Sequence, residues 1–191
     1  MEKKKKTLEE EYNDCWIYML LLTTVVILKE SVKTYYFTLN GSMISYSIFL
    51  LPAMFFIANY IGKKYDYKKA IAAIAISAVT AISYTAVLSF ALGKRLILTS
   101  ITGDFCGYVA SQFVNLTIYN FLLNNTKSPY ILVFLTYLFS IIVYYMIYTL
   151  IHLNLVIADG YWSKYFITMI IEFVICLPVA YFDKTIKRGL S

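Results

Sequence analysis

The residues that could do chemistry form a line of polar side chains inside the stretch 99–124. They recur at steps of four, three, four and four, the spacing of one helix face, and they are Asp104, Tyr108, Ser111, Asn115 and Tyr119, with Gln112 beside them. Carboxylate, amide and phenol groups are costly at membrane depth unless they face partner helices or a water-lined cavity. The stripe therefore predicts a solute cavity or a polar interface between helices.

Two glycines on the same predicted helix favour close packing. Gly103 and Gly107 form a GxxxG pair, which lets a second backbone approach closely. The glycines and the polar stripe could serve only to hold helices together, because polar residues are common at such interfaces. Either interpretation requires neighbours packed against this helix.

Two further polar residues are candidates for the same cavity. Glu172 lies near the middle of the apolar stretch 165–182, where a charge is rare without a functional reason. Asn59 is the one strongly polar residue of the stretch 43–61. With Asp104, Gln112 and Asn115, they could supply hydrogen-bond donors and acceptors to a ligand.

The charged residues near the end of the first apolar stretch allow two interpretations. Glu30 and Lys33 are three apart and could pair on one helix face, while Lys29 could extend its ammonium to a membrane surface. In the first interpretation they form a frayed helix end at the membrane interface. In the second, Lys33 or Glu30 reaches a central cavity.

Composition places the chain among integral membrane proteins. Of its 191 residues 60% are hydrophobic and 15% charged, and the mean hydropathy is +0.67, which excludes a soluble domain. A span takes about 20 apolar residues. We expect an all-α, six-transmembrane-helix bundle with spans near residues 15–37, 43–61, 70–92, 99–124, 130–153 and 165–182. Pro52 is expected to kink the second span.

Charge in the connecting segments predicts the orientation. With the N-terminus inside, the inner segments hold twelve Lys and Arg residues and the outer loops three. This bias predicts a multi-pass inner-membrane protein with a charged cytoplasmic N-terminus (1–14), a single transmembrane domain (15–183) and a basic cytoplasmic tail (184–191). Orientation also accounts for the net charge of +6, so nucleic acid is not an expected partner.

Motifs for catalysis are lacking. The sequence contains no HExxH, no GxSxG, no phosphate-binding Gly-rich loop and no Cys/His cluster. Cys15, Cys106 and Cys176 have neither CxxC spacing nor an even count, so they are expected to be small core residues. We expect no enzyme, no cofactor and no metal.

A binding cavity is the better-supported chemistry. Carboxylates and amides combined with many Tyr and Phe rings suit a small planar heterocycle, which would be read by paired hydrogen bonds and stacked between rings. The same acids could instead form a proton or cation path in which Asp104 and Glu172 change protonation. The expected partners are a small-molecule substrate and the lipid bilayer.

Three segments, 32–70, 103–123 and 172–188, carry a family resemblance. Their features are Lys33 before a glycine turn, Pro52 followed by the IGKK sequence and a basic loop, Gln112 with a polar residue three later, and Pro178 before a basic end. Over about half of its length the chain resembles the vitamin uptake transporter family, also called the queuosine precursor transporters. The resemblance implies six helices, inner-membrane placement and import of 7-deazaguanine precursors of the tRNA base queuosine.

The chain departs from the family at several charged positions. Asp104 and Glu172 stand where the family is not usually charged, whereas uncharged residues occupy positions where it usually carries charge: Phe55, Asn59, Asn115, Tyr144, and Thr168 or Met169. The predicted function is import of a small planar heterocycle, with Asp104, Gln112, Asn115, Asn59, Glu172, Tyr108 and Lys33 at the site. The alternatives are a substrate-binding component that works with a separate energy-coupling module, or a structural or assembly protein without a substrate. A second copy of the chain is a further candidate partner.

Overall fold

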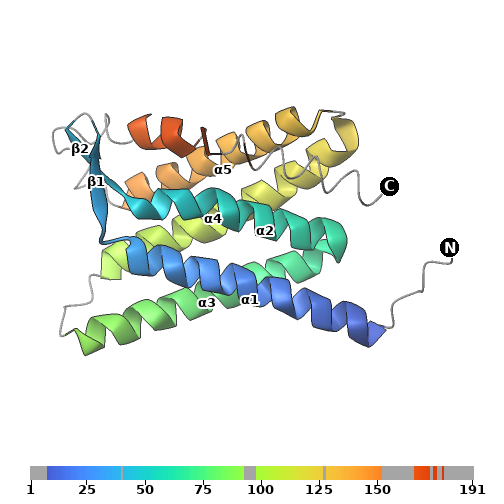
Figure 1. Ribbon diagram of the computed structural model, residues 1–191, viewed down its shortest axis with the longest axis horizontal. Coiled ribbons are helices and arrows are strands. Elements are labelled where there is room, and N and C mark those ends of the chain that lie inside the picture. The colour runs from blue at the N-terminus through green and yellow to red at the C-terminus, as the bar shows by residue number, and fades with distance from the viewer. Residues whose placement is uncertain are drawn as a thin grey trace.

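The computed structural model describes residues 8–39, 41–92, 98–126, 128–151, 166–172, 174, 175 and 178. Among these residues the structure is almost entirely helical (Figure 1). The elements in chain order are α1 (Leu8–Val32), β1 (Tyr36–Leu39), β2 (Ser42–Ser45), the 3-10 helix η1 (Tyr46–Leu50), α2 (Leu51–Lys64), α3 (Tyr67–Ala91), α4 (Leu98–Asn125) and α5 (Pro129–Ile151). A further helical segment covers residues 166–172.

The long helices lie roughly side by side and alternate in direction along the chain (Figure 1). Helices α2, α3 and α4 contact one another, α1 packs on α2 and α3, and α5 packs on α4. The end of α1, the two strands, the start of α4 and the end of α5 lie at one end of the bundle (Figure 1). Residues far apart in the sequence can therefore meet at that end.

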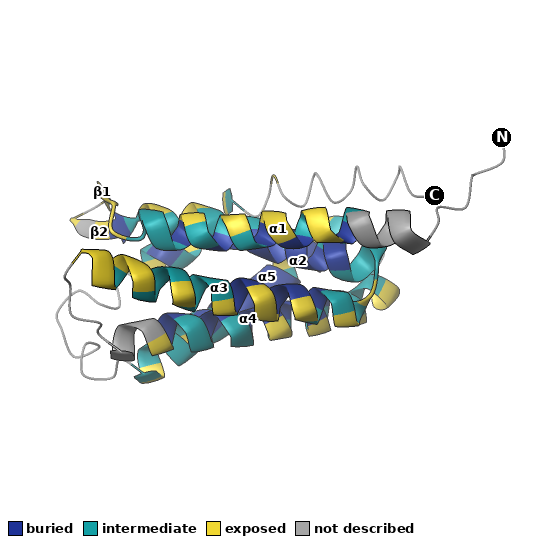
Figure 2. Cartoon of the chain, turned by 90° about the horizontal axis from the view of Figure 1, so that it is seen from below, coloured by how far each residue is buried: buried dark blue, intermediate teal, exposed yellow. Residues whose placement is uncertain are grey.

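Burial follows the membrane pattern expected from the composition. Buried residues lie mostly on the parts of the helices that adjoin other helices, and exposed residues lie mostly on the outside of the bundle (Figure 2). Large apolar side chains occupy that outer surface, for example Leu20, Phe121 and Ile170. Exposing so many large apolar side chains would be unfavourable in water but not in lipid, so the surface fits a membrane environment.

Four of the described helical segments are long and apolar enough to cross a membrane: Asp14–Val32, Tyr46–Lys64, Tyr67–Ala91 and Pro129–Ile151. This confirms the expected class of fold for those four. Helix α4 is long enough but is not among them, because its polar stripe lowers its hydropathy. Of the expected sixth span, only part lies within the described residues, and the Lys and Arg residues of the 93–97 and 152–165 segments lie outside them.

The connection after α1 differs from the sequence prediction. Instead of continuing to residue 37, α1 ends at Val32, and the next residues form an antiparallel hairpin in which Tyr36 pairs with Ser45. Gly41 has φ of 78° in the turn of this hairpin, a backbone conformation that glycine adopts without steric cost. The hairpin covers one end of the bundle.

The predicted kink at Pro52 is wrong. Proline lies in the first turn of α2, where the missing N–H has no helical acceptor and the fixed φ suits the helix. The preceding residues form η1 with Ser45 as its N-cap, the hydroxyl of which accepts from the backbone N–H of Ser47. The second predicted span is therefore a strand, a short 3-10 helix and an α-helix in succession.

Gly107, the second glycine of the GxxxG pair, lies at a tight helix contact. A Cβ on Gly107 would be 3.1 Å from the backbone oxygen of Tyr144 and 3.2 Å from its ring. This is tighter than most packed methyl contacts, so the absence of a side chain lets α4 and α5 approach closely. Tyr144 is thereby held against the first half of α4.

Candidate functional site

A hollow lies at the hairpin end of the bundle. Its volume is about 190 Å³, which is smaller than the pockets that hold drug-sized ligands. We call it the main cavity, and its lining residues come from five segments: Lys33, Tyr36, Ser45, Ser47, Ile48, Asp104, Tyr144, Tyr145, Tyr148 and Thr168. Nearly all of these side chains end in a hydroxyl or a charge. The main cavity therefore offers charged and hydroxyl groups on a wall that is mostly apolar in area, and its size suits a small metabolite.

An ion pair between α1 and α4 forms part of the wall. The Lys33 ammonium pairs with the Asp104 carboxylate, which also accepts a hydrogen bond from the Tyr144 hydroxyl at 3.1 Å. Glu30 lies on the other side of the ammonium, with Nζ of Lys33 3.9 Å from its carboxylate. The expected Glu30–Lys33 pair is present, and it faces the interior instead of a frayed helix end.

A second lysine joins this charged group from below. Lys29 is only 5% exposed, with its ammonium 3.2 Å from the Glu30 carboxylate and 5.4 Å from the centre of the Tyr144 ring. Lys29 therefore does not take the option of extending its ammonium to a membrane surface. Its burial is compensated by one carboxylate and one aromatic face.

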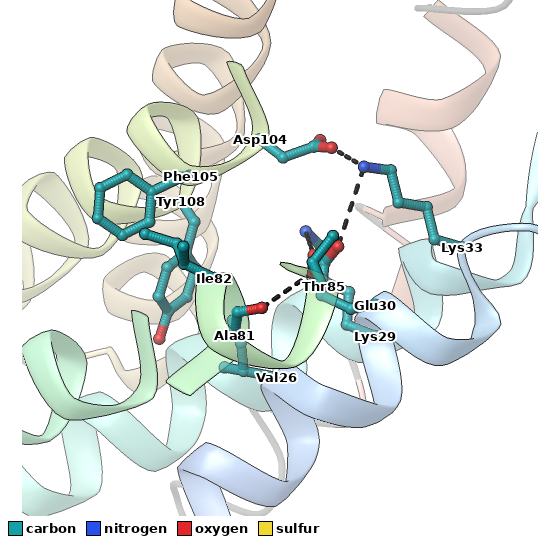
Figure 3. A pocket seen from close by; sticks show the side chains of 10 residues that line it. All are labelled: Val26, Lys29, Glu30, Lys33, Ala81, Ile82, Thr85, Asp104, Phe105 and Tyr108. Atoms are coloured by element: carbon teal, nitrogen blue, oxygen red, sulfur yellow. Dashed lines mark hydrogen bonds and ion pairs between the residues drawn. The ribbon is translucent and has the colours of Figure 1, made fainter. Parts of the chain in front are cut away.

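Figure 3 shows how these side chains meet between α1, α3 and α4. Lys33 and Asp104 point toward one another, and Glu30 reaches the same ammonium from the α1 side. Beneath them is a small pocket of about 30 Å³, enough for one or two water molecules. Tyr108 lines its far wall, and its hydroxyl is 2.8 Å from that of Ser77 on α3.

Glu172 lies behind the wall of the main cavity and does not line it. Its carboxylate accepts a long hydrogen bond of 3.4 Å from Tyr145, which does line the cavity. The side chain is 1% exposed, and its second oxygen has no hydrogen-bond partner within the described structure. Tyr145 and Tyr144 thus connect the two intramembrane acids, Glu172 and Asp104, through neighbouring positions on α5.

The two predicted amides, Asn59 and Asn115, do not reach the main cavity. They bond to each other reciprocally, at 3.1 Å and 2.9 Å, and Asn115 also donates to the Phe55 carbonyl at 3.3 Å. Asn115 follows Asp104 by eleven residues on α4, a separation of about 16 Å along the helix. The amides therefore join α2 to α4 well below the charged group, with each other as partners.

Gln112 occupies the level between these two groups. It is fully buried, and neither its amide nitrogen nor its oxygen has a partner among the described residues. It lines neither the main cavity nor the small pocket. Of the seven predicted site residues, Lys33 and Asp104 line the main cavity, while Tyr108, Glu172, Gln112 and the amide pair lie around or below it.

Several lining residues were not among the predicted site residues. Tyr36, Ser45 and Ser47 come from the hairpin and η1, and their signal was the alternation around Asn40-Gly41, which is typical of a two-residue hairpin turn. Tyr144 and Tyr145 were visible only as part of an aromatic run. Their position opposite Asp104 depends on how α5 packs, which the sequence pattern does not specify.

The fold and the site together define a helical membrane protein with a cavity at one end of its bundle that bears charged and hydroxyl groups. Within the described residues no group of His, Cys, Asp and Glu side chains could hold a metal ion. No family model, curated protein or solved structure matches the chain.

Proposed function

We propose that this protein carries a small polar solute across a membrane and binds it in the main cavity. The observation that supports this most directly is the Lys33–Asp104 ion pair in the wall of a cavity of about 190 Å³. An ion pair that only stabilised the bundle would be expected in a packed interior. Here both charges border open space in which a ligand could replace either partner.

The chemistry of the wall indicates what such a ligand offers. Asp104 can accept from N–H donors, and the Lys33 ammonium can donate to a carbonyl or a ring nitrogen. Tyr144 and Tyr148 lie with their rings stacked, at 14° and 6.4 Å between centroids, which gives the cavity a flat aromatic side. A planar heterocycle with a donor next to an acceptor fits these groups best.

The resemblance described above supplies a specific candidate, a 7-deazaguanine precursor of queuosine, which has such an edge. We propose import of this class of compound by a six-span inner-membrane protein with both termini cytoplasmic. In that orientation the hairpin and the main cavity face the outside, and the basic loop between α2 and α3 faces the cytoplasm. The cavity would then receive the solute from the external side.

Uptake in cells tests the proposal. Cells that cannot synthesise the precursor are supplied with it, and queuosine in their tRNA is measured with the wild-type protein, with Asp104→Ala and with Lys33→Ala. We expect rescue by the wild type and loss of rescue in both variants. Ser83→Ala is the matched control, because its hydroxyl is exposed and bonds only to the Val79 carbonyl of its own helix.

The outcomes separate the alternatives. Full rescue by both variants at normal membrane levels would exclude the main cavity as the binding site. Uptake that requires a co-purifying coupling protein and two ATPases would favour the substrate-binding component of an energy-coupling module. If no purine, deazapurine or vitamin raises the unfolding temperature of the purified protein, a structural role gains support, since a ligand that binds the folded state must stabilise it.

A further inference from the structure

The buried charges around the main cavity do not balance. The described charged groups there are the cations Lys29 and Lys33 and the acids Glu30, Asp104 and Glu172. Glu30 contacts both lysines and Asp104 contacts Lys33, so these four groups form one compact set. Glu172 is left with no cation in ion-pair range among the described residues.

The surroundings of Glu172 are also poor in hydrogen bonds. The described titratable groups that interact with it are Tyr145 and Tyr144 from α5 and the Lys29 ammonium from α1. Among the described residues only the Tyr145 hydroxyl is within hydrogen-bond distance of Glu172, and one oxygen of the carboxylate has no partner there. A fully buried carboxylate with one weak hydrogen bond is too costly to remain charged.

A proton is a better occupant of this position than a metal cation. A bound metal ion would need several oxygen ligands around it, whereas Tyr145 is the one described residue that offers an oxygen to Glu172. A proton on the free oxygen removes the charge without any further ligand. Protonation also turns that oxygen into a donor, so a neighbouring acceptor, including a water molecule or the solute, could then bind it.

We propose that Glu172 is the site of a coupling proton that drives solute accumulation through the main cavity. One proton from the external water adds to the free oxygen of Glu172 and gives a neutral carboxyl group. Release of that proton to the cytoplasmic side restores the carboxylate and allows the next cycle. Tyr145 is the physical link, because its side chain lines the cavity and its hydroxyl contacts the carboxyl group.

This inference rests on the proposed transport function, and proteoliposomes distinguish the two. Wild type and Glu172→Gln are compared for exchange of labelled solute at equal pH and for accumulation under an inward proton gradient. Glutamine keeps the shape of the side chain but cannot gain or lose a proton. We expect exchange to persist and gradient-driven accumulation to be lost, with at least partial recovery of accumulation in Glu172→Asp, which keeps a carboxyl group.

Each other result overturns the coupling role. Accumulation by Glu172→Gln at the wild-type level would show that the proton binds elsewhere. Loss of both exchange and solute binding in a folded variant would make Glu172 a ligand of the solute, and accumulation driven by a sodium gradient alone would replace the proton by a metal cation.

A second measurement decides the protonation state even if no transported solute is found. Infrared difference spectra of the purified protein should show the carbonyl stretch of a neutral carboxyl group at neutral pH. We expect this band to be absent from Glu172→Gln and to be retained in Asp104→Asn, because Asp104 is paired with a lysine. A spectrum without the band in the wild type would refute the proposal independently of transport.

Discussion

The Lys33–Asp104 pair allows a sharp prediction about stability, because its two partners are not equally replaceable. Lys33→Met removes the ammonium but keeps the aliphatic stem. Among the described residues it leaves the Asp104 side chain, which is 9% exposed, with only the Tyr144 hydroxyl as a partner. Removing one partner of a buried pair costs about 3–5 kcal/mol. Because the cavity admits water and Tyr144 still donates, we expect a cost near the lower limit, about 3 kcal/mol.

Asp104→Asn should be much less costly. The amide oxygen can still accept from Tyr144, and Lys33 is 32% exposed and keeps Glu30 as a neighbour at 3.9 Å. Loss of a partly solvated pair costs about 1 kcal/mol or less. The double variant contains no unpaired carboxylate at this position, so we expect it to be about 2 kcal/mol more stable than Lys33→Met alone.

The assay is reversible unfolding of the purified protein in mixed detergent and SDS micelles, with the free energy of unfolding fitted for the four proteins. We expect the free energy of unfolding to be highest for the wild type and lowest for Lys33→Met. Asp104→Asn and the double variant should lie between them, close to each other. If Asp104→Asn were as damaging as Lys33→Met, or if the two costs simply added, the ion pair would not be the interaction that holds these helices at the cavity.

Further predictions concern packing and the amide pair. Gly107→Ala should lower the unfolding temperature and weaken solute binding, since overpacking costs about 1–3 kcal/mol and displaces Tyr144. Gly62→Ala is the control and should change neither measurement, because a Cβ there would meet its nearest neighbour at an ordinary 3.4 Å. Asn115→Leu should cost about 1–3 kcal/mol by leaving the buried amide of Asn59 unpaired, and adding Asn59→Leu should restore part of that loss in the same unfolding assay. In calorimetry Asn59→Leu should bind the solute with the wild-type affinity, while Asp104→Asn should not bind it. Loss of binding in both variants would show that the amide pair is part of the binding site.

The polar stripe shows how far the sequence could be interpreted. Its helical spacing predicted a helix over residues 99–124, and α4 covers Leu98–Asn125 with Asp104, Gln112 and Asn115 all buried. The spacing of a sequence pattern indicates which residues share a helix face, because that depends only on local helix geometry. It does not report which neighbour each residue meets, and so the amides were assigned to the cavity although they pair with each other.

The hairpin and the proline illustrate a different limit. A proline within an apolar stretch is compatible with a kinked helix and with the first turn of a new one. What decided between them was the strand pairing of Ser42–Ser45 with Tyr36–Leu39, a contact between two short segments that are individually too weak in pattern to predict. The residues that the hairpin adds to the cavity were missed for the same reason.

The vertical order of polar groups along α4 places a physical requirement on transport. At the hairpin end Asp104 borders open space, whereas farther along Gln112 is fully buried and Asn115 is held to Asn59 by two hydrogen bonds. In the transport proposed above, a solute that passed between α2 and α4 would have to separate this amide pair, at a net cost of about 1–3 kcal/mol for its two bonds. Solvation of the freed amides by the solute or by water would offset much of that cost. Reciprocal amides thus suit a barrier that opens and recloses, while an apolar contact at the same level would offer a passing polar solute no compensating hydrogen bonds.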